Sequence, residues 1–248
     1  MPDDTQIGGP QARFPTTRWS AVNGVAGSDP EERGRAFGAI VGAYWKPVYK
    51  HIRIKWQRSN EEAKDLTQGF FAEALAKRFF DAYDPGKARF RTFLRICVDR
   101  YVSNEGKAAT RLKRGGGAQI VSLDFNAAEH ELACAGPTAA DEDRFDREWV
   151  RSLFGLAVEA LREHCLSHGK QVQFQIFQRY DLRDDADPRP TYAELAAEYG
   201  IAPTDVTNFL AYARREYRRL VLAKLQEITA GDEEFRSEAR CLLGVDPT

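Results

Sequence analysis

The sequence predicts a protein that is nearly all α-helical, and three observations lead to this fold class. Apolar residues recur three and four positions apart over long stretches, which is the spacing of one helix face. Glycine- and proline-rich turn signals interrupt these stretches, and no segment shows the pattern of a strand. With 248 residues, the chain is long enough for two domains that each bury a core.

The N-terminal half predicts three helices, at Arg33–Trp56, Glu61–Phe80 and Arg89–Lys113. Pro47 should kink or split the first helix, because proline cannot donate to the backbone ladder and its ring clashes with the preceding turn. A strong turn signal at Asp84–Gly86 separates the second helix from the third. This half should therefore form a small helical bundle.

Charge is segregated along the chain, although the formal net charge is only −1. Residues 86–114 contain nine Lys and Arg residues against two acids, whereas residues 124–148 contain eight acids against two arginines. The local field matters more than the total charge for a polyanionic partner, so the basic stretch is a candidate nucleic-acid surface. A solvated helix beside an acidic loop is the plainer alternative.

The C-terminal half begins after a segment, Gln119–Asp143, that shows little periodicity and is interpreted as an acidic linker. Helical spacing resumes near Phe145 and again at Val172–Tyr180. The stretch Asp181–Pro190 reads as an acidic loop. Near the C-terminus, Gly231–Val245 has the pattern of an acidic amphipathic helix.

The stretch Thr191–Leu210 predicts a helix-turn-helix. Thr191 and Glu194 form a capping box, Gly200 suits the tight turn, and Pro203 suits the first position of a new helix. The second helix should bury Val206, Leu210, Ala213, Tyr217 and Leu220. Its opposite face should present Thr204, Thr207, Asn208, Ala211 and Arg215 to a major groove. The basic residues expected to bind phosphates are Arg214, Arg218, Arg219 and Lys224. An ordinary helical hairpin with a solvated face is the alternative.

The sequence contains no pattern typical of an enzyme or a membrane protein. It lacks a phosphate-binding glycine loop, GxSxG and HExxH, so we expect no catalytic residues and no cofactor. His164, Cys165 and His168 could offer metal ligands, but a further ligand at a suitable spacing is missing, so no metal is expected. Four scattered cysteines, the absence of a signal peptide and the absence of a membrane span favour a cytoplasmic location.

Five motifs in this order resemble the extracytoplasmic-function (ECF) class of bacterial RNA polymerase sigma factors. They are FPTTRW at Phe14–Trp19, DLTQGFF at Asp65–Phe71, RFRTFL at Arg89–Leu94, KRGGG at Lys113–Gly117 and YAELA at Tyr192–Ala196. The resemblance implies a sigma region-two-like domain at residues 14–114 and a region-four-like helix-turn-helix domain at 145–227. The remaining parts would be an N-terminal stretch at 1–13 without fixed structure, a flexible linker at 115–144 and an acidic extension at 228–248.

The resemblance also implies partners and residue roles. Core RNA polymerase would bind the acidic face of one helix, at Glu62, Asp65, Gln68 and Glu73, where Gly69 would permit close approach. The loop Tyr83–Lys87 would capture a flipped base. The minus-ten promoter element would contact Lys87, Arg89, Arg91, Arg95, Arg100 and Asn104. The minus-thirty-five element would contact Thr204, Thr207, Asn208, Ala211, Arg214, Arg215 and Arg218.

Three further expectations concern regulation and the choice of function. Phosphorylation of Thr67 by a Ser/Thr kinase would add negative charge to the polymerase-binding helix. The acidic tail at Gly231–Thr248 could instead cover the basic face of Arg89–Lys113, and an anti-sigma factor is a third route to an inactive state. A helix-turn-helix regulator that acts without polymerase is the main alternative function, and a metal-binding enzyme is a remote one.

Overall fold

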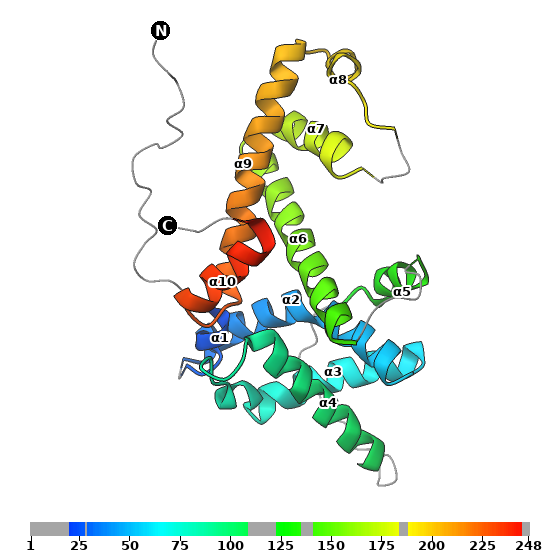
Figure 1. Cartoon of the computed structure of the whole chain (residues 1–248), viewed down its shortest axis with the longest axis vertical. Helices are drawn as coiled ribbons and strands as arrows, with labels where there is room; N and C mark the ends of the chain where they lie inside the picture. The colour runs from blue at the N-terminus through cyan, green and yellow to red at the C-terminus, as the bar shows by residue number, and fades with distance from the viewer. Residues whose placement is uncertain (1–19, 28, 109–122, 135–140, 184–187, 245–248) are drawn as a thin grey trace.

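The computed structural model describes residues 20–27, 29–108, 123–134, 141–183 and 188–244, and these ranges contain helices but no strand (Figure 1). The expected all-α class is therefore confirmed for this part of the chain. In chain order the helices are α1 (Ala21–Gly24), α2 (Pro30–Lys55), α3 (Asn60–Ala76), the 3-10 helix η1 (Phe79–Ala82), α4 (Phe90–Ala108), α5 (Phe125–Cys134), α6 (Asp141–Ser167), α7 (Gln171–Asp181), α8 (Tyr192–Tyr199), α9 (Pro203–Glu227) and α10 (Asp232–Leu243).

The larger of two hydrophobic clusters is built around α2. Its fully buried side chains include Ile40, Tyr44 and Tyr49, against which α3 and α4 pack Phe70 and Phe90. Aromatic rings pack against one another in this core. The centroids of the Tyr44 and Phe90 rings, for example, lie 5.6 Å apart in an edge-to-face arrangement. Pro47 is buried inside α2, and the helix continues through the proline, so of the two expected effects, a kink or a split, the split does not occur.

The smaller cluster lies at the other end of the molecule and supports the helix-turn-helix. It contains Phe177 from α7, Leu195 from α8, and Val206, Leu210 and Ala213 from α9. The expected inward positions on α9 are confirmed, because these last three side chains are buried, and Tyr217 and Leu220 pack against the cluster.

Two long helices connect the clusters. The N-terminal part of α6 contributes Phe145, Trp149 and Leu153 to the larger cluster, and its C-terminal part contributes Leu161 to the smaller one. Helix α9 runs in the opposite direction: its N-terminal part contributes to the smaller cluster, and its C-terminal part contributes Leu225 to the larger one. The two helices lie side by side along the length of the molecule (Figure 1). The division between the two hydrophobic clusters therefore falls within α6.

Two segments expected to lie outside the cores contribute to the larger one. Helix α5 forms in the middle of the expected linker and buries Phe125 between Trp45 and Tyr49, with ring separations of 5.3 and 5.1 Å. Helix α10 forms in the expected extension and buries Phe235. Within the stretch expected to be a flexible linker, residues Phe125–Cys134 are thus helical, and Phe125 packs against α2.

Candidate functional surfaces

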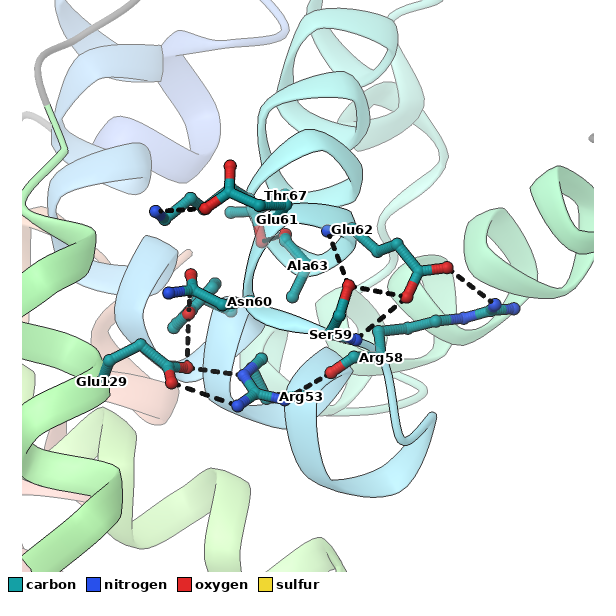
Figure 2. A network of polar contacts seen from close by, with 11 residues as sticks. Arg53, Arg58, Ser59, Asn60, Glu61, Glu62, Ala63, Thr67 and Glu129 are labelled. Atoms are coloured by element: carbon teal, nitrogen blue, oxygen red, sulfur yellow. Dashed lines mark hydrogen bonds and ion pairs between the residues drawn. The ribbon is translucent and has the colours of Figure 1, made fainter.

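The acidic face of α3 begins with a capping box. The Ser59 hydroxyl accepts a hydrogen bond from the Glu62 N–H, and the Glu62 carboxylate accepts one from the Ser59 N–H at 3.0 Å (Figure 2). The same carboxylate lies 3.6 Å from the Arg58 guanidinium. Hydrogen bonds from the backbone and hydroxyl of Ser59 lower the pKa of the Glu62 carboxyl below its usual value. Glu62 is exposed, as expected, but it also starts the helix, a role that the Ser-x-x-Glu spacing signals in the sequence.

The other expected polymerase-binding residues lie further along α3. Asp65 is exposed, whereas Gln68 and Glu73 are half-buried. The Glu73 carboxylate lies 2.5 Å from the ammonium group of Lys77, one turn away on the helix. Asp65 is therefore the residue of this set that is both exposed and outside the capping box.

Thr67 points into the core rather than toward solvent. Its side chain is 0% exposed, and its hydroxyl donates a hydrogen bond of 2.7 Å to the carbonyl oxygen of Ala63 (Figure 2). A kinase could reach this hydroxyl only after α3 had left its packed position. Phosphorylation of the folded chain at Thr67 is therefore not supported by the geometry.

Gly69 makes close approach possible for α4, not for an external partner. A Cβ atom at this position would lie 2.4 Å from the hydroxyl oxygen of Tyr101. The space above Gly69 is thus occupied by a side chain of the same molecule. This corrects the expectation that Gly69 leaves room for the polymerase.

The expected minus-ten residues fall into an open group and a covered group. Lys87, Arg100 and Asn104 are exposed. Arg100 and Asn104 line a hollow of about 390 Å³ between α3, η1 and α4, which also contains Phe79 and Tyr101. Arg95 is half-buried, and its side chain interacts with another group of the same chain. The open group could contact a nucleic-acid strand without rearrangement.

Arg91 is covered, whereas Arg89 is exposed but paired with the same acid of α10 as Arg91. The guanidinium of Arg91 is stacked over the Trp149 ring at 4.7 Å, and the residue is 8% exposed. It binds Glu238 of α10 at 2.5 Å and Asp146 of α6 at 3.1 Å. Arg89 lies 3.3 Å from the same Glu238 carboxylate. Direct access of Arg91 to DNA is therefore absent in this conformation, and the acids that cover it lie far away in the sequence.

The loop before α4 is held by short-range hydrogen bonds. The Asp84 carboxylate accepts a hydrogen bond of 3.0 Å from the Gly86 N–H. It also forms an ion pair with Lys87 at 3.0 Å. The Tyr83 hydroxyl donates to the carbonyl oxygen of Ala88, while its ring packs against Phe90. In the sequence, Asp84–Gly86 signalled a turn, and the structure has this turn.

The helix-turn-helix has the expected local geometry. Thr191 and Glu194 form the capping box at the start of α8, and Gly200 adopts a left-handed conformation with φ of 65° between the helices. At the start of α9, Ala202 provides no side-chain cap, but Asp205 accepts a hydrogen bond from the Ala202 N–H at 3.3 Å. The two helices are thus positioned by the residues that the sequence indicated.

The expected DNA-facing side chains of α9 are open to solvent. The exposed residues are Thr204, Thr207, Asn208, Ala211, Arg214, Arg215 and Arg218. Arg214 differs from the others because two of its nitrogen atoms bind the Asp181 carboxylate of α7, at 2.8 and 2.9 Å. A bidentate pair of this kind fixes a guanidinium in place. Arg214 therefore links α7 to α9, a partnership that sequence spacing did not indicate.

Among the described residues, His164 of α6 and His168, which directly follows this helix, do not form a metal centre with their neighbours. The His164 and His168 rings stack with centroids 4.2 Å apart, and the His164 Nε2 atom lies 3.0 Å from the Tyr212 hydroxyl. No group of three or more His, Cys, Asp or Glu side chains suited to a metal ion occurs among the described residues. None of the helices in the described ranges is both long enough and apolar enough to cross a membrane.

The motifs FPTTRW and KRGGG lie outside the described residues, whereas the other three motifs lie on α3, α4 and α8. No protein-family model matches this chain, and the searches of curated proteins and of solved structures also returned no match.

Proposed function

We propose that this chain is a sigma factor of the ECF type, which binds core RNA polymerase, recognises a promoter and helps to melt it. The observation that carries the proposal is a helix-turn-helix with an exposed polar face on α9, in one chain with the acidic face of α3 and the basic helix α4. The first surface suits the major groove of duplex DNA. The second and third suit a basic partner helix and a single strand.

On this proposal, α3 provides the polymerase contact. Asp65 supplies an exposed negative charge, and Gln68 and Glu73 extend the face toward the C-terminal end of the helix. Charge complementarity mainly sets orientation and association rate at an interface, so a partner with basic side chains is favoured. Glu62 contributes to this face and also caps the helix.

Promoter DNA would contact the two ends of the molecule. At one end, Thr207, Asn208 and Arg215 would reach base edges of the minus-thirty-five element. At the other, Arg100 and Asn104 border a hollow with aromatic walls, which supports contact with an unstacked base of the minus-ten element. The region-two-like unit would comprise α2, α3 and α4, and the region-four-like unit α7, α8 and α9.

The decisive experiment is co-purification with bacterial core RNA polymerase. The tagged chain should retain the core enzyme, and Asp65→Lys should weaken retention about tenfold, because it places a like charge against a basic partner. Glu163→Lys is the matched control, since Glu163 is exposed on α6, away from α3. Equal retention by both variants and the unaltered chain would show that α3 is not the interface.

The Asp65 variant is preferable to a double reversal that includes Glu62. Replacing Glu62 would remove half of a capping box, at a cost of about 1 kcal/mol of helix stability, and would confound the result. Circular dichroism of each variant checks that the helical content is unchanged.

A helix-turn-helix regulator that acts alone is the second candidate, and α9 by itself supports it as well as it supports a sigma factor. Failure of the chain to retain core polymerase, combined with sequence-specific binding to duplex DNA through Asn208 and Arg215, would favour this candidate. A run-off transcription assay with core polymerase would distinguish the two functions directly.

A further inference from the structure

Helix α10 is anchored by apolar and backbone contacts beside the start of α4. Phe235 and Ala239 are buried in the larger cluster. The turn between α9 and α10 is held from α1, where the Ser20 hydroxyl donates to the Thr229 carbonyl oxygen at 2.5 Å and the Asn23 side chain donates to that of Ala230 at 2.7 Å. The helix therefore lies in a defined position, next to α1 and the end of α9 (Figure 1).

The first turn of α10 directs a carboxylate at the N-terminus of α4. One oxygen of Glu234 accepts a hydrogen bond of 2.8 Å from the Phe90 N–H, the first backbone amide of α4. The other oxygen accepts one of 2.9 Å from the Ala230 N–H, and the Tyr83 hydroxyl lies 3.4 Å away. The first turn of α4 contains no acidic residue of its own. Glu234 thus supplies the negative charge that favours the positive end of a helix.

One turn later, Glu238 pairs with the two arginines on either side of this N-terminus, Arg89 before Phe90 and Arg91 after it. Glu238 is 2% exposed and binds Arg91 at 2.5 Å and Arg89 at 3.3 Å, while the Ser237 hydroxyl accepts a further hydrogen bond from Arg89. The second oxygen of Glu238 is buried and has no hydrogen-bond partner among the residues that the structure describes. A buried carboxylate oxygen that accepts no hydrogen bond lowers the stability of the contact between Glu238 and the arginines. Another anionic group that accepts more hydrogen bonds from these arginines can therefore displace Glu238.

We propose that α10 is an internal competitor of nucleic acid: its carboxylates occupy the basic start of α4 and must leave before a DNA strand can bind there. A helix N-terminus flanked by two arginines favours phosphate groups for the same reasons that it favours these carboxylates. The idea rests on the proposed role of α4 in binding DNA. It adds an inactive state that this chain imposes on itself, without a kinase or a second protein.

The test is binding of a fluorescein-labelled single-stranded DNA to the full chain, followed by anisotropy at one fixed salt concentration. Glu238→Gln should tighten binding about tenfold, the factor that corresponds to about one charge-assisted hydrogen bond. Glu233→Gln carries the same change of net charge on the exposed side of α10 and should change binding less than about twofold. Equal effects of the two variants would overturn the proposal.

Two further variants make the result specific. Phe235→Ala loosens α10 without changing any charge, and it should also tighten binding. Adding Arg91→Ala to Glu238→Gln should remove the gain, because the gain depends on the uncovered arginine. A gain that survives without Arg91 would locate the DNA contact elsewhere and would contradict the proposal.

The same proteins, tested for retention of core polymerase, separate this inference from the proposed function. Retention of polymerase without any gain in DNA binding would overturn the competitor role of α10 and leave the sigma function intact. A gain in DNA binding without retention of polymerase would support the competitor role and count against the sigma function.

Discussion

At the contact between α3 and α4, a small residue on one helix makes room for a large residue on the other. Gly69 and Tyr101 form the clearest pair, since the tyrosine hydroxyl occupies the space in which any larger residue would place its Cβ atom. Burial, followed by the nearby charges of Glu105 and Glu73, raises the pKa of Tyr101 to about 12, so the side chain is neutral at ordinary pH. The contact is therefore one of shape rather than charge.

A double-mutant cycle tests this pairing. Gly69→Ala should lower the free energy of unfolding by about 1 kcal/mol, because overpacking against Tyr101 outweighs the better helix propensity of alanine. In a Tyr101→Phe background the hydroxyl is gone, and the same change should raise stability by up to about 1 kcal/mol. Urea unfolding measures both. A Gly69→Ala effect of equal sign and size in the two backgrounds would contradict the assignment.

Arg91 shows why residue roles are harder to predict than residue positions. Helical spacing predicted α4, and the run of arginines on it indicated a polyanion surface. The local sequence contains no information on Glu238, which lies 147 residues away, or on the stacking of Arg91 over Trp149. Only the packing of α6 and α10 on the bundle decides that this arginine is covered while Arg100 is open.

At the scale of elements, α5 is held against α2 by buried apolar side chains and by ion pairs. Phe125 and Ala128 are buried. Glu129 binds Arg53 of α2 through two nitrogen atoms, at 2.5 and 3.1 Å (Figure 2). Glu131 binds Lys46 and Lys50 at 2.8 and 2.7 Å. The acidic stretch that suggested a solvated linker is thus paired with cations of α2.

Removing the aromatic anchor should release this helix alone. Phe125→Ala removes a buried ring, at a cost of about 3 kcal/mol or more, so amides of α5 should exchange on the order of a hundredfold faster. Hydrogen exchange followed by mass spectrometry would show this, with amides of α3 unchanged. Asn126→Ala, an exposed neighbour, is the control. Unchanged protection of α5 would mean that Phe125 is not its anchor.

The elements that could be predicted are those with local signals at both ends. The helix-turn-helix has a capping box at Thr191, a left-handed glycine at Gly200 and a proline at the start of α9, all of which the sequence displays. Helix α5 follows Asp124 and precedes Gly136-Pro137, but it has no capping box and only one buried aromatic residue, so its composition indicates a linker. Its stability comes from α2, which neither its length nor its composition reveals.

At the scale of the whole molecule, buried and half-buried carboxylates join the helices of the larger cluster to α2. Asp99 of α4 accepts hydrogen bonds from His51, Lys55 and Trp56 at 2.8, 2.8 and 3.0 Å. Burial alone would raise the pKa of Asp99, but these three hydrogen bonds together hold it well below the usual value. The hydrogen bond from Arg53 likewise lowers the pKa of Glu129.

These depressed pKa values fix the direction of the pH dependence. A carboxyl group whose pKa is lower in the folded state binds fewer protons than in the unfolded state, so stability rises with pH through this range. The contribution is complete above the unfolded pKa, at about 4, and is lost as the pH falls further toward the folded value. The larger cluster should therefore loosen in acid, as α4 and α5 lose their links to α2.

Asp99→Asn isolates one of these links. At pH 7 the variant should be about 1–3 kcal/mol less stable than the unaltered chain, because three donors lose their charged acceptor. As the pH falls from 5 to 3, this difference should shrink, since protonation removes the same charge from the unaltered chain while the amide does not titrate. Urea unfolding at each pH measures the two curves, and Asp65→Asn, which changes an exposed carboxylate of α3, is the control. Curves for the Asp99 variant and the unaltered chain that stay parallel across this range would show that the Asp99 carboxylate does not link α4 to α2.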